Sequence, residues 1–147
     1  MQISRSTGFR NAVLVTGSVT DVLAGAVLKI YSGPMPASAD AALSGNTLLC
    51  TYSGNGVPAA GLEFEATPIN GALLKKASQS WSGNAVASGT ATFCRFEMPA
   101  DTGASSTSAV RIQGDVALAN AMLNLTNGVT FASGAPQAIQ SFVLSLP

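Results

Sequence analysis

Short runs of β-forming residues, separated by turn residues, dominate the hydrophobic pattern of this chain. Val, Ile, Leu, Phe and Tyr gather in brief segments, and Gly, Pro, Asn and Ser end most of them. We expect strands over residues 26–31, 46–52, 62–66, 73–81, 90–98, 108–114, 116–125, 129–132 and 138–146. Closely spaced short strands with frequent turns predict a mainly β fold, a single-domain antiparallel β-sandwich or barrel of jelly-roll-like form.

Two of these segments alternate clearly between apolar and polar residues. In 90–98 the apolar side chains alternate with Thr92, Arg95 and Glu97, and in 62–66 they alternate with Glu63 and Glu65. Successive strand residues point to opposite faces, so the alternation in 62–66 predicts one solvated face. The segment 90–98 gives the strongest strand prediction in the chain. Between 101 and 107 the small residues predict a hairpin loop, with 108–114 as its return strand.

Turn and cap residues divide the rest of the chain. Ser6-Thr7 is a helix cap, and the apolar spacing after it predicts a short helix over 8–15 that ends near Gly17, so residues 1–25 form an N-terminal arm or short helix. One turn of helix fits 38–43. The dipeptide Asn127-Gly128 predicts a tight hairpin.

The length and charge of the chain limit its partners. It has 147 residues, the size of one domain spanning 1–147, with seven Lys+Arg, seven Asp+Glu and a formal net charge of +0. Only 10% of residues are charged, against about 25% in an ordinary soluble domain. Nucleic acid needs clustered basic residues, so we expect no nucleic-acid partner. A nearly uncharged surface does little to prevent association, so we expect a homo-oligomer.

The apolar residues never form a long run. A bilayer-spanning helix needs about 20 of them, and Asn11, Thr16 and Asp21 interrupt any signal-peptide core. We therefore expect no membrane partner, and synthesis and residence in the cytosol.

The residue types needed for most catalysis and metal binding are scarce. Histidine is absent, which removes the commonest general base and metal ligand. We expect no enzyme activity, no cofactor and no metal. The carboxylates of Glu63 and Glu65 fit either a solvated strand face or, much less well, glycosidase chemistry. Gly54-Asn55-Gly56 lacks a following Lys-Ser or Lys-Thr and indicates a turn, not a phosphate loop.

The two cysteines and the basic residues each allow two interpretations. Cys50 and Cys94 lie in segments expected to be strands, where they are either reduced, buried thiols or a disulfide across the core; a cytosolic chain favours the thiols.

Lys75-Lys76 is either solvated or faces an acidic partner. Arg95 and Arg111 flank Asp101 in the expected hairpin and indicate interfacial or intramolecular ion pairs.

Several motifs together resemble a group of small virion proteins of tailed bacteriophages. They are Ser6-Thr7-Gly8-Phe9-Arg10-Asn11, Leu28-Lys29-Ile30-Tyr31-Ser32-Gly33, Gly89-Thr90-Ala91-Thr92-Phe93-Cys94-Arg95-Phe96, Val110-Arg111-Ile112-Gln113-Gly114 and Gln140-Ser141-Phe142-Val143-Leu144. They span most of the chain, and their order carries more weight than any one motif. Glu97-Met98-Pro99 and Pro136 depart from the pattern. The resemblance implies a virion component present in many copies.

From these observations we expect a capsid decoration or cement protein that stabilises the phage head by bridging major capsid subunits. A tail, neck or fibre-base protein is the alternative, and a carbohydrate or host-surface binding β module is a further one. The expected location is the virion, assembled in the host cytoplasm, with the major capsid protein or other virion proteins as partners. The residues expected to contact a partner are Ile3, Arg5, Phe9, Pro34, Met35, Pro36, Arg95 and Arg111.

Overall fold

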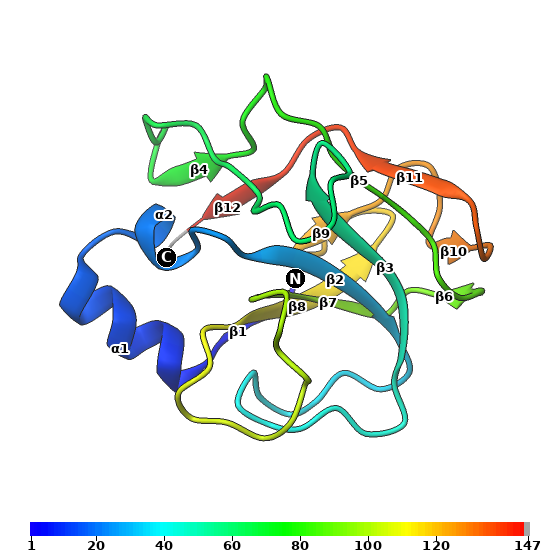
Figure 1. The fold of residues 1–147 in the computed structure, drawn as a ribbon, viewed down its shortest axis with the longest axis horizontal. Helices are drawn as coiled ribbons and strands as arrows, with labels where there is room; N and C mark the ends of the chain where they lie inside the picture. Colours follow the sequence, from blue (N-terminus) through cyan, green and yellow to red (C-terminus); the bar gives the residue numbers. More distant parts are fainter. Residues whose placement is uncertain (146–147) are drawn as a thin grey trace.

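Strands make up most of the regular structure in a computed structural model that describes residues 1–145 (Figure 1). In chain order the elements are β1 (Ile3–Arg5), α1 (Thr7–Thr16), α2 (Val19–Val22), β2 (Val27–Ser32), β3 (Thr47–Gly54), β4 (Ala72–Leu74), β5 (Trp81–Asn84), β6 (Gly89–Thr90), β7 (Phe93–Glu97), β8 (Ile112–Ala117), β9 (Leu123–Asn124), β10 (Thr130–Phe131), β11 (Pro136–Ile139) and β12 (Val143–Ser145). The expected mainly β class with a short N-terminal helix is confirmed.

Eight strands form one large sheet. Their order is β1-β8-β7-β2-β3-β5-β11, with antiparallel neighbours throughout, and β9 adds to β8 in parallel. β2 lies near the middle, where Leu28 pairs with Tyr52 on one side and with Phe96 on the other. Every residue of β2 except Ser32 is buried, as expected for a strand covered on both faces.

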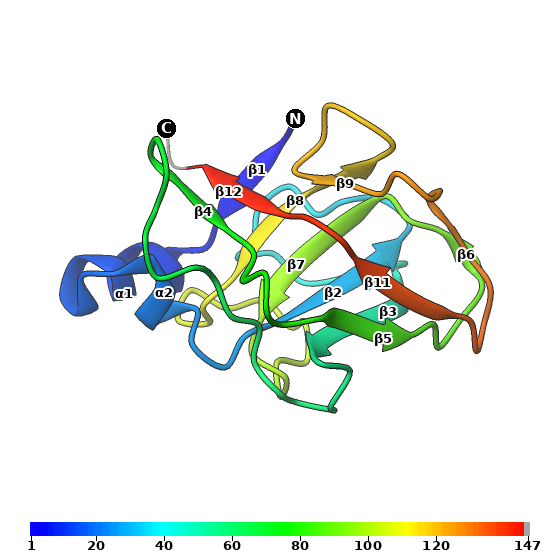
Figure 2. The same cartoon turned by 90° about the horizontal axis from the view of Figure 1, so that it is seen from above.

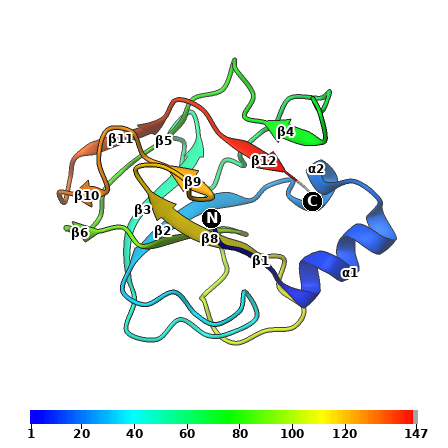
Figure 3. The ribbon, with the colours of Figure 1, turned by 180° about the vertical axis from the view of Figure 1, so that it is seen from behind.

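The C-terminal strands cover one face of this sheet. The chain runs from β11, at the edge of the main sheet, into β12, which pairs with β4. The β4–β12 pair lies above the main sheet in Figures 1 and 3, and Figure 2, the view from above, shows the pair on the near side of the sheet. Phe64, Trp81, Phe96 and Phe142 meet between the layers, with ring centroids 5.2–6.5 Å apart. This aromatic cluster forms the centre of the apolar core, and the architecture is sandwich-like.

Helix α1 begins and ends where its cap residues indicate. The Ser6 hydroxyl accepts a hydrogen bond from the Phe9 amide at 3.0 Å, and Gly17 closes the helix with φ 95°. A Cβ at Gly8 would lie 2.3 Å from the Ser108 carbonyl oxygen, so the first turn packs directly on the 108–109 backbone. The rest of the helix extends beyond the sheet (Figures 1 and 3).

Three expected elements are wrong or shorter than expected. Residues 38–43 form turns instead of a helix, because long-range partners engage their backbone and Asp40. Residues 62–66 form a single bridge, since Leu62 N donates to Ala26 O whereas Glu65 N donates to Leu74 O. The segment 73–81 divides into β4 and the start of β5, with a turn between them.

The C-terminal third also differs from expectation. Asn127-Gly128 does not join a hairpin, because β9 pairs with β8 and β10 pairs with β6. The expected strand over 138–146 is interrupted, since the chain changes partner from β5 to β4 between β11 and β12. Residue 146 lies outside the described residues.

The cysteines are separate, buried thiols, so the expected reduced state is confirmed. Cys50 and Cys94 are both paired with Ile30, one on each side of β2. Two strand spacings amount to roughly 9–10 Å, whereas a disulfide requires Cα atoms within about 7 Å. Burial raises the pKa of Cys50 to about 12, so this thiol stays protonated and unreactive at neutral pH.

Candidate functional site

A row of polar side chains crosses the face of the sheet opposite the apolar core. Lys29 of β2, Arg95 of β7 and Gln113 of β8 lie directly opposite one another. Because strand side chains alternate, these three point away from the core. They are nevertheless only 9%, 0% and 1% exposed. This face of the sheet is therefore covered.

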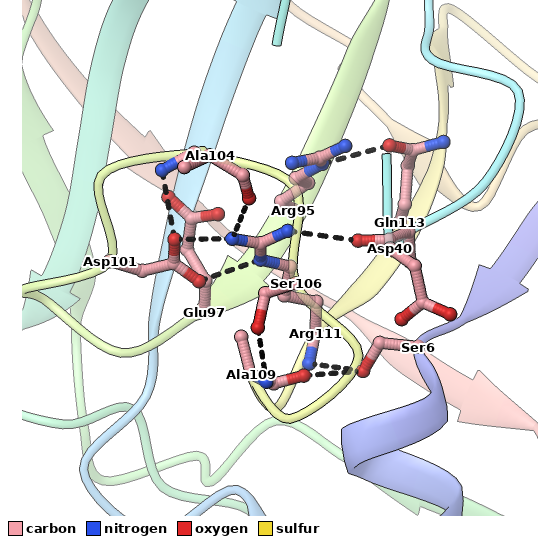
Figure 4. A network of polar contacts seen from close by, with 12 residues as sticks. Ser6, Asp40, Arg95, Glu97, Asp101, Ala104, Ser106, Ala109, Arg111 and Gln113 are labelled. Carbon is pink, nitrogen blue, oxygen red and sulfur yellow. Dashed lines mark hydrogen bonds and ion pairs between the residues drawn. The ribbon is translucent and has the colours of Figure 1, made fainter. Parts of the chain in front are cut away.

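Two loops bury this row: residues 33–46 between β2 and β3, and residues 98–111 between β7 and β8 (Figure 4). Carbonyls of the first loop accept hydrogen bonds from the sheet and from the second loop: Pro36 O from Gln113 Nε2 at 2.8 Å, Ala39 O from Arg111 Nη1 at 3.2 Å, and Ala41 O from Arg95 Nη2 at 2.9 Å. Irregular backbone needs such partners because a buried, unpaired carbonyl is costly. The polar row thus fixes the loop to the sheet.

Arg111 and Asp101 form a bidentate ion pair within the second loop. Arg111 Nε and Nη2 each lie 2.7 Å from an Asp101 oxygen, and Nη2 also donates to Ala104 O at 2.8 Å. The side chains are 1% and 8% exposed. The intramolecular alternative for Arg111 is therefore confirmed, and this pair closes the base of the 98–111 loop.

Asp101 stays ionised in this setting. Burial by itself raises its pKa, but hydrogen bonds from Arg111 and Gly103 and the charges of Arg111 and Lys29 outweigh burial and lower it. The hydrogen bonds that Arg111 donates to Asp101 raise the pKa of Arg111 despite partial burial.

A second group surrounds Glu97. Lys29 Nζ lies 2.8 Å from Glu97 Oε1, and the Tyr31 hydroxyl donates to the same oxygen at 3.0 Å. Lys29 Nζ also donates to Asp101 O at 3.0 Å, which links this group to the second loop. Burial, and then the nearby Glu97, raises the pKa of Tyr31, so its hydroxyl remains a donor.

The start of α1 joins the same assembly. The Ser6 hydroxyl donates to Ala109 O at 2.7 Å and accepts from the Arg111 amide at 2.9 Å. Thr7 donates to Asp40 through both its amide and its hydroxyl, at 2.8 and 2.6 Å. The hydrogen bonds from Thr7 lower the pKa of Asp40. We name the set Lys29, Tyr31, Arg95, Glu97, Asp101, Arg111 and Gln113 the polar cluster.

The polar cluster serves chiefly to hold backbone. Within residues 1–145 only Arg95 Nη1 and Glu97 Oε2 of its members are buried without a hydrogen-bond partner. Burial, and then the charge of Arg111, lowers the pKa of Arg95. The described part of the chain holds no group of three or more Cys, Asp or Glu placed to bind a metal ion. The cluster therefore fits a structural role.

The predicted contact residues are divided between interior and surface. We expected Phe9, Arg95 and Arg111 to contact a partner, but these residues are only 2%, 0% and 1% exposed, so that expectation is corrected. Phe9 packs in the apolar core, and the two arginines belong to the polar cluster. The others are Ile3, Arg5, Met35 and Pro36, which are half-buried, and Pro34, which is exposed. Ile3 and Arg5 lie on β1 at the edge of the main sheet.

The polar cluster was not predicted, although the sequence contains a signal for its members. Lys29 stands in the middle of the most apolar strand, and Glu97 follows Arg95 by two residues, where both share a face. Gly- and Pro-containing loops follow both strands. A charged stripe on an otherwise core-forming strand, next to long loops, indicates a covered polar face.

The remaining candidate charges pair locally on the surface. Lys76 Nζ binds the Glu63 carboxylate, and Glu65 accepts a hydrogen bond from the Ala77 amide at 2.7 Å. Lys75 Nζ donates to Gln79 O at 2.6 Å. These contacts, including those of the Glu63 and Glu65 carboxylates, hold the turn after β4.

Comparison of the chain with protein-family models, curated protein sequences and solved structures gives no match. Neither helix of the described residues is long and apolar enough to span a bilayer.

Stability is expected to fall as the pH drops below about 4, where unfolded Asp carboxyls titrate. Asp101 has a lowered pKa in the folded state, so the unfolded state binds the proton first and acid favours unfolding. The contribution of Asp101 is complete above its unfolded pKa and is lost as the pH falls through its folded pKa. Urea denaturation at several pH values between neutral and about pH 3 measures this slope.

The Asp101→Asn variant is the control. It is less stable at neutral pH, and its stability depends less on pH over the acid range. An unchanged acid slope in this variant would show that Asp101 is not the group responsible.

Proposed function

We propose that this chain is a structural component of a bacteriophage virion, a capsid decoration or cement protein that bridges major capsid subunits. It is assembled in the host cytoplasm and acts in many copies on the head. In this role the domain presents a rigid, nearly uncharged surface to its partners and catalyses no reaction.

The distribution of charge carries this proposal. Of the seven basic and seven acidic residues, four are buried, three are exposed and the other seven are half-buried. The buried ones are Lys29, Arg95, Glu97 and Arg111, and the exposed ones are Arg10, Asp21 and Glu63. The buried charges fix the two loops from inside. The surface that remains is rich in Ala, Ser, Thr, Gly and Asn, with little net field to keep copies or partners apart. Such a surface suits permanent contact in an assembly.

Helix α1 adds an apolar feature to this surface. Leu14 and Val15 are 84% and 89% exposed near the end of the helix that extends from the sheet. Neighbouring exposed aliphatic side chains on a projecting element support burial against another protein in the working state. The resemblance to tailed-phage virion proteins supplies the kind of assembly.

A tail, neck or fibre-base protein is the second candidate. It would need the same rigid, charge-poor domain, so the surface favours neither location. The two differ in stoichiometry, because head-lattice proteins follow the number of capsid subunits and the other parts do not.

The copy number in particles of the virus that encodes this chain tests the proposal. Quantitative mass spectrometry, normalised to the major capsid protein, is expected to give about one copy per capsid subunit or a simple fraction of it. A few to a few dozen copies per particle would move the protein to the neck, tail or fibres. Absence from purified particles would reject the virion proposal.

A high-salt wash before the measurement provides the control. Salt screens contacts between exposed charges, and this surface has few of them. The copy number is therefore expected to be unchanged after the wash, whereas an adsorbed contaminant held by charge would be lost.

A further inference from the structure

We infer that the cavity between β11 and the 124–130 segment is a binding site for an uncharged saccharide. This inference goes beyond the structural role proposed above and does not depend on it. It assigns a ligand class to a site remote from the polar cluster.

The cavity has a volume of about 430 Å³, within the usual range of small-molecule sites. Residues 124–128 and Thr130 line one side, residues 136–141 line the other, and Tyr52 of β3 reaches it from the core. Figures 1 and 3 both show β10 and β11 at one end of the molecule, with β9 nearer its middle.

The fold keeps these two sides apart. The 124–130 segment is held by β8 at one end and by β6 at the other, whereas β11 is held by β5. The turn at Asn127 and Gly128, where Gly128 has φ 115°, therefore stands beside β11 without pairing to it. Because Asn127 and Gly128 do not join a hairpin, a cavity remains between this turn and β11.

The chemistry of the lining is uniform, since no lining residue carries a charge. The lining includes exposed or half-buried amide and hydroxyl side chains that a ligand can reach: Thr126, Asn127, Thr130, Gln137 and Gln140. Amides and hydroxyls both donate and accept, which matches the hydroxyl groups of a sugar. A phosphate, carboxylate or ammonium group would find no opposite charge here.

Tyr52 supplies a directed donor from the core side. The residue is 1% exposed, and its hydroxyl has no hydrogen-bond partner among the described residues. Burial raises its pKa, so the hydroxyl carries its proton at neutral pH. A polar group anchored in a rigid core can orient a ligand that the surrounding amides bind.

Titration of the ¹⁵N-labelled protein with glucose, galactose, mannose, rhamnose and N-acetylglucosamine, each up to tens of millimolar, tests the site by amide chemical shifts. At least one sugar is expected to shift amides of 124–130 and 136–141 selectively, with a Kd of about a millimolar. N-acetylneuraminic acid, which is charged, is expected to bind at least tenfold more weakly.

The Thr126→Ala/Gln137→Ala variant is expected to weaken that sugar at least tenfold. Asn11→Ala, an exposed amide on α1, is the matched control and leaves binding unchanged. If the double variant fails to fold, Thr126→Ala at its exposed position takes its place. The inference is overturned if no neutral sugar shifts these amides, if the shifts map elsewhere, or if the charged sugar binds equally well.

Discussion

Replacing Arg111 by methionine is expected to lower the free energy of unfolding by about 3–5 kcal/mol, the usual result of removing one partner from a buried ion pair. Asp101 would remain as a buried carboxylate without its bidentate partner. The carbonyls of Ala39 and Ala104 would lose their donor as well. The Arg111 side chain fastens both loops, so a single substitution loosens both, whereas the contacts of Ser6 with the backbone of residue 111 remain.

Urea denaturation followed by Trp81 fluorescence measures the effect, and thermal unfolding should show a fall of roughly 10 °C. Arg10→Met is the matched control. This arginine is exposed and donates only to Thr7, so a change within about 0.5 kcal/mol is expected.

The double variant Arg111→Met/Asp101→Leu removes both charges. It therefore distinguishes the destabilisation caused by an unpaired Asp101 from the net contribution of the ion pair to the free energy of unfolding. Apolar replacement of both partners often restores stability. Much of the loss in Arg111→Met is therefore expected to be recovered. A loss below about 1 kcal/mol in the single variant would contradict the role of Arg111 as the central fastening point.

Replacing Trp81 by alanine is expected to cost about 3–5 kcal/mol through the cavity it leaves. The indole is 0% exposed and touches Phe64, Phe96 and Phe142. Its Nε1 donates to Gln79 Oε1 at 3.0 Å, an oxygen that also accepts from the Glu63 amide. Far-ultraviolet circular dichroism follows unfolding, because this variant has no tryptophan left.

Trp81→Phe retains an aromatic ring and loses the indole donor, so an intermediate loss is expected. Val86→Ala, at a position that is 64% exposed, serves as a control for truncation outside the core. If Trp81→Ala unfolded at nearly the same urea concentration as the parent protein, the aromatic cluster would not be the centre of the core.

Local rules in the sequence determined the class of fold and several of its parts. The run of β-forming residues in 26–31 and the alternation in 90–98 predict strands, and both strands are present. Ser6 and Gly17 define α1 because capping depends on residues within one helical turn. Two cysteines in a chain expected to be cytosolic predict thiols, and the structure has thiols.

Only the tertiary structure decided what covers each face of these strands. The alternation of Arg95 and Glu97 with apolar residues implies a second face of the strand, but it does not reveal whether a loop lies over that face. The covering carbonyl of Ala41 is 54 residues from Arg95, and that of Pro36 is 77 from Gln113. Likewise, Asn127-Gly128 encodes a turn, but the pairing of β9 and β10 with distant strands opened the cavity beside it. Propensity acts over a few residues, whereas burial and strand pairing depend on contacts that only the folded chain brings together.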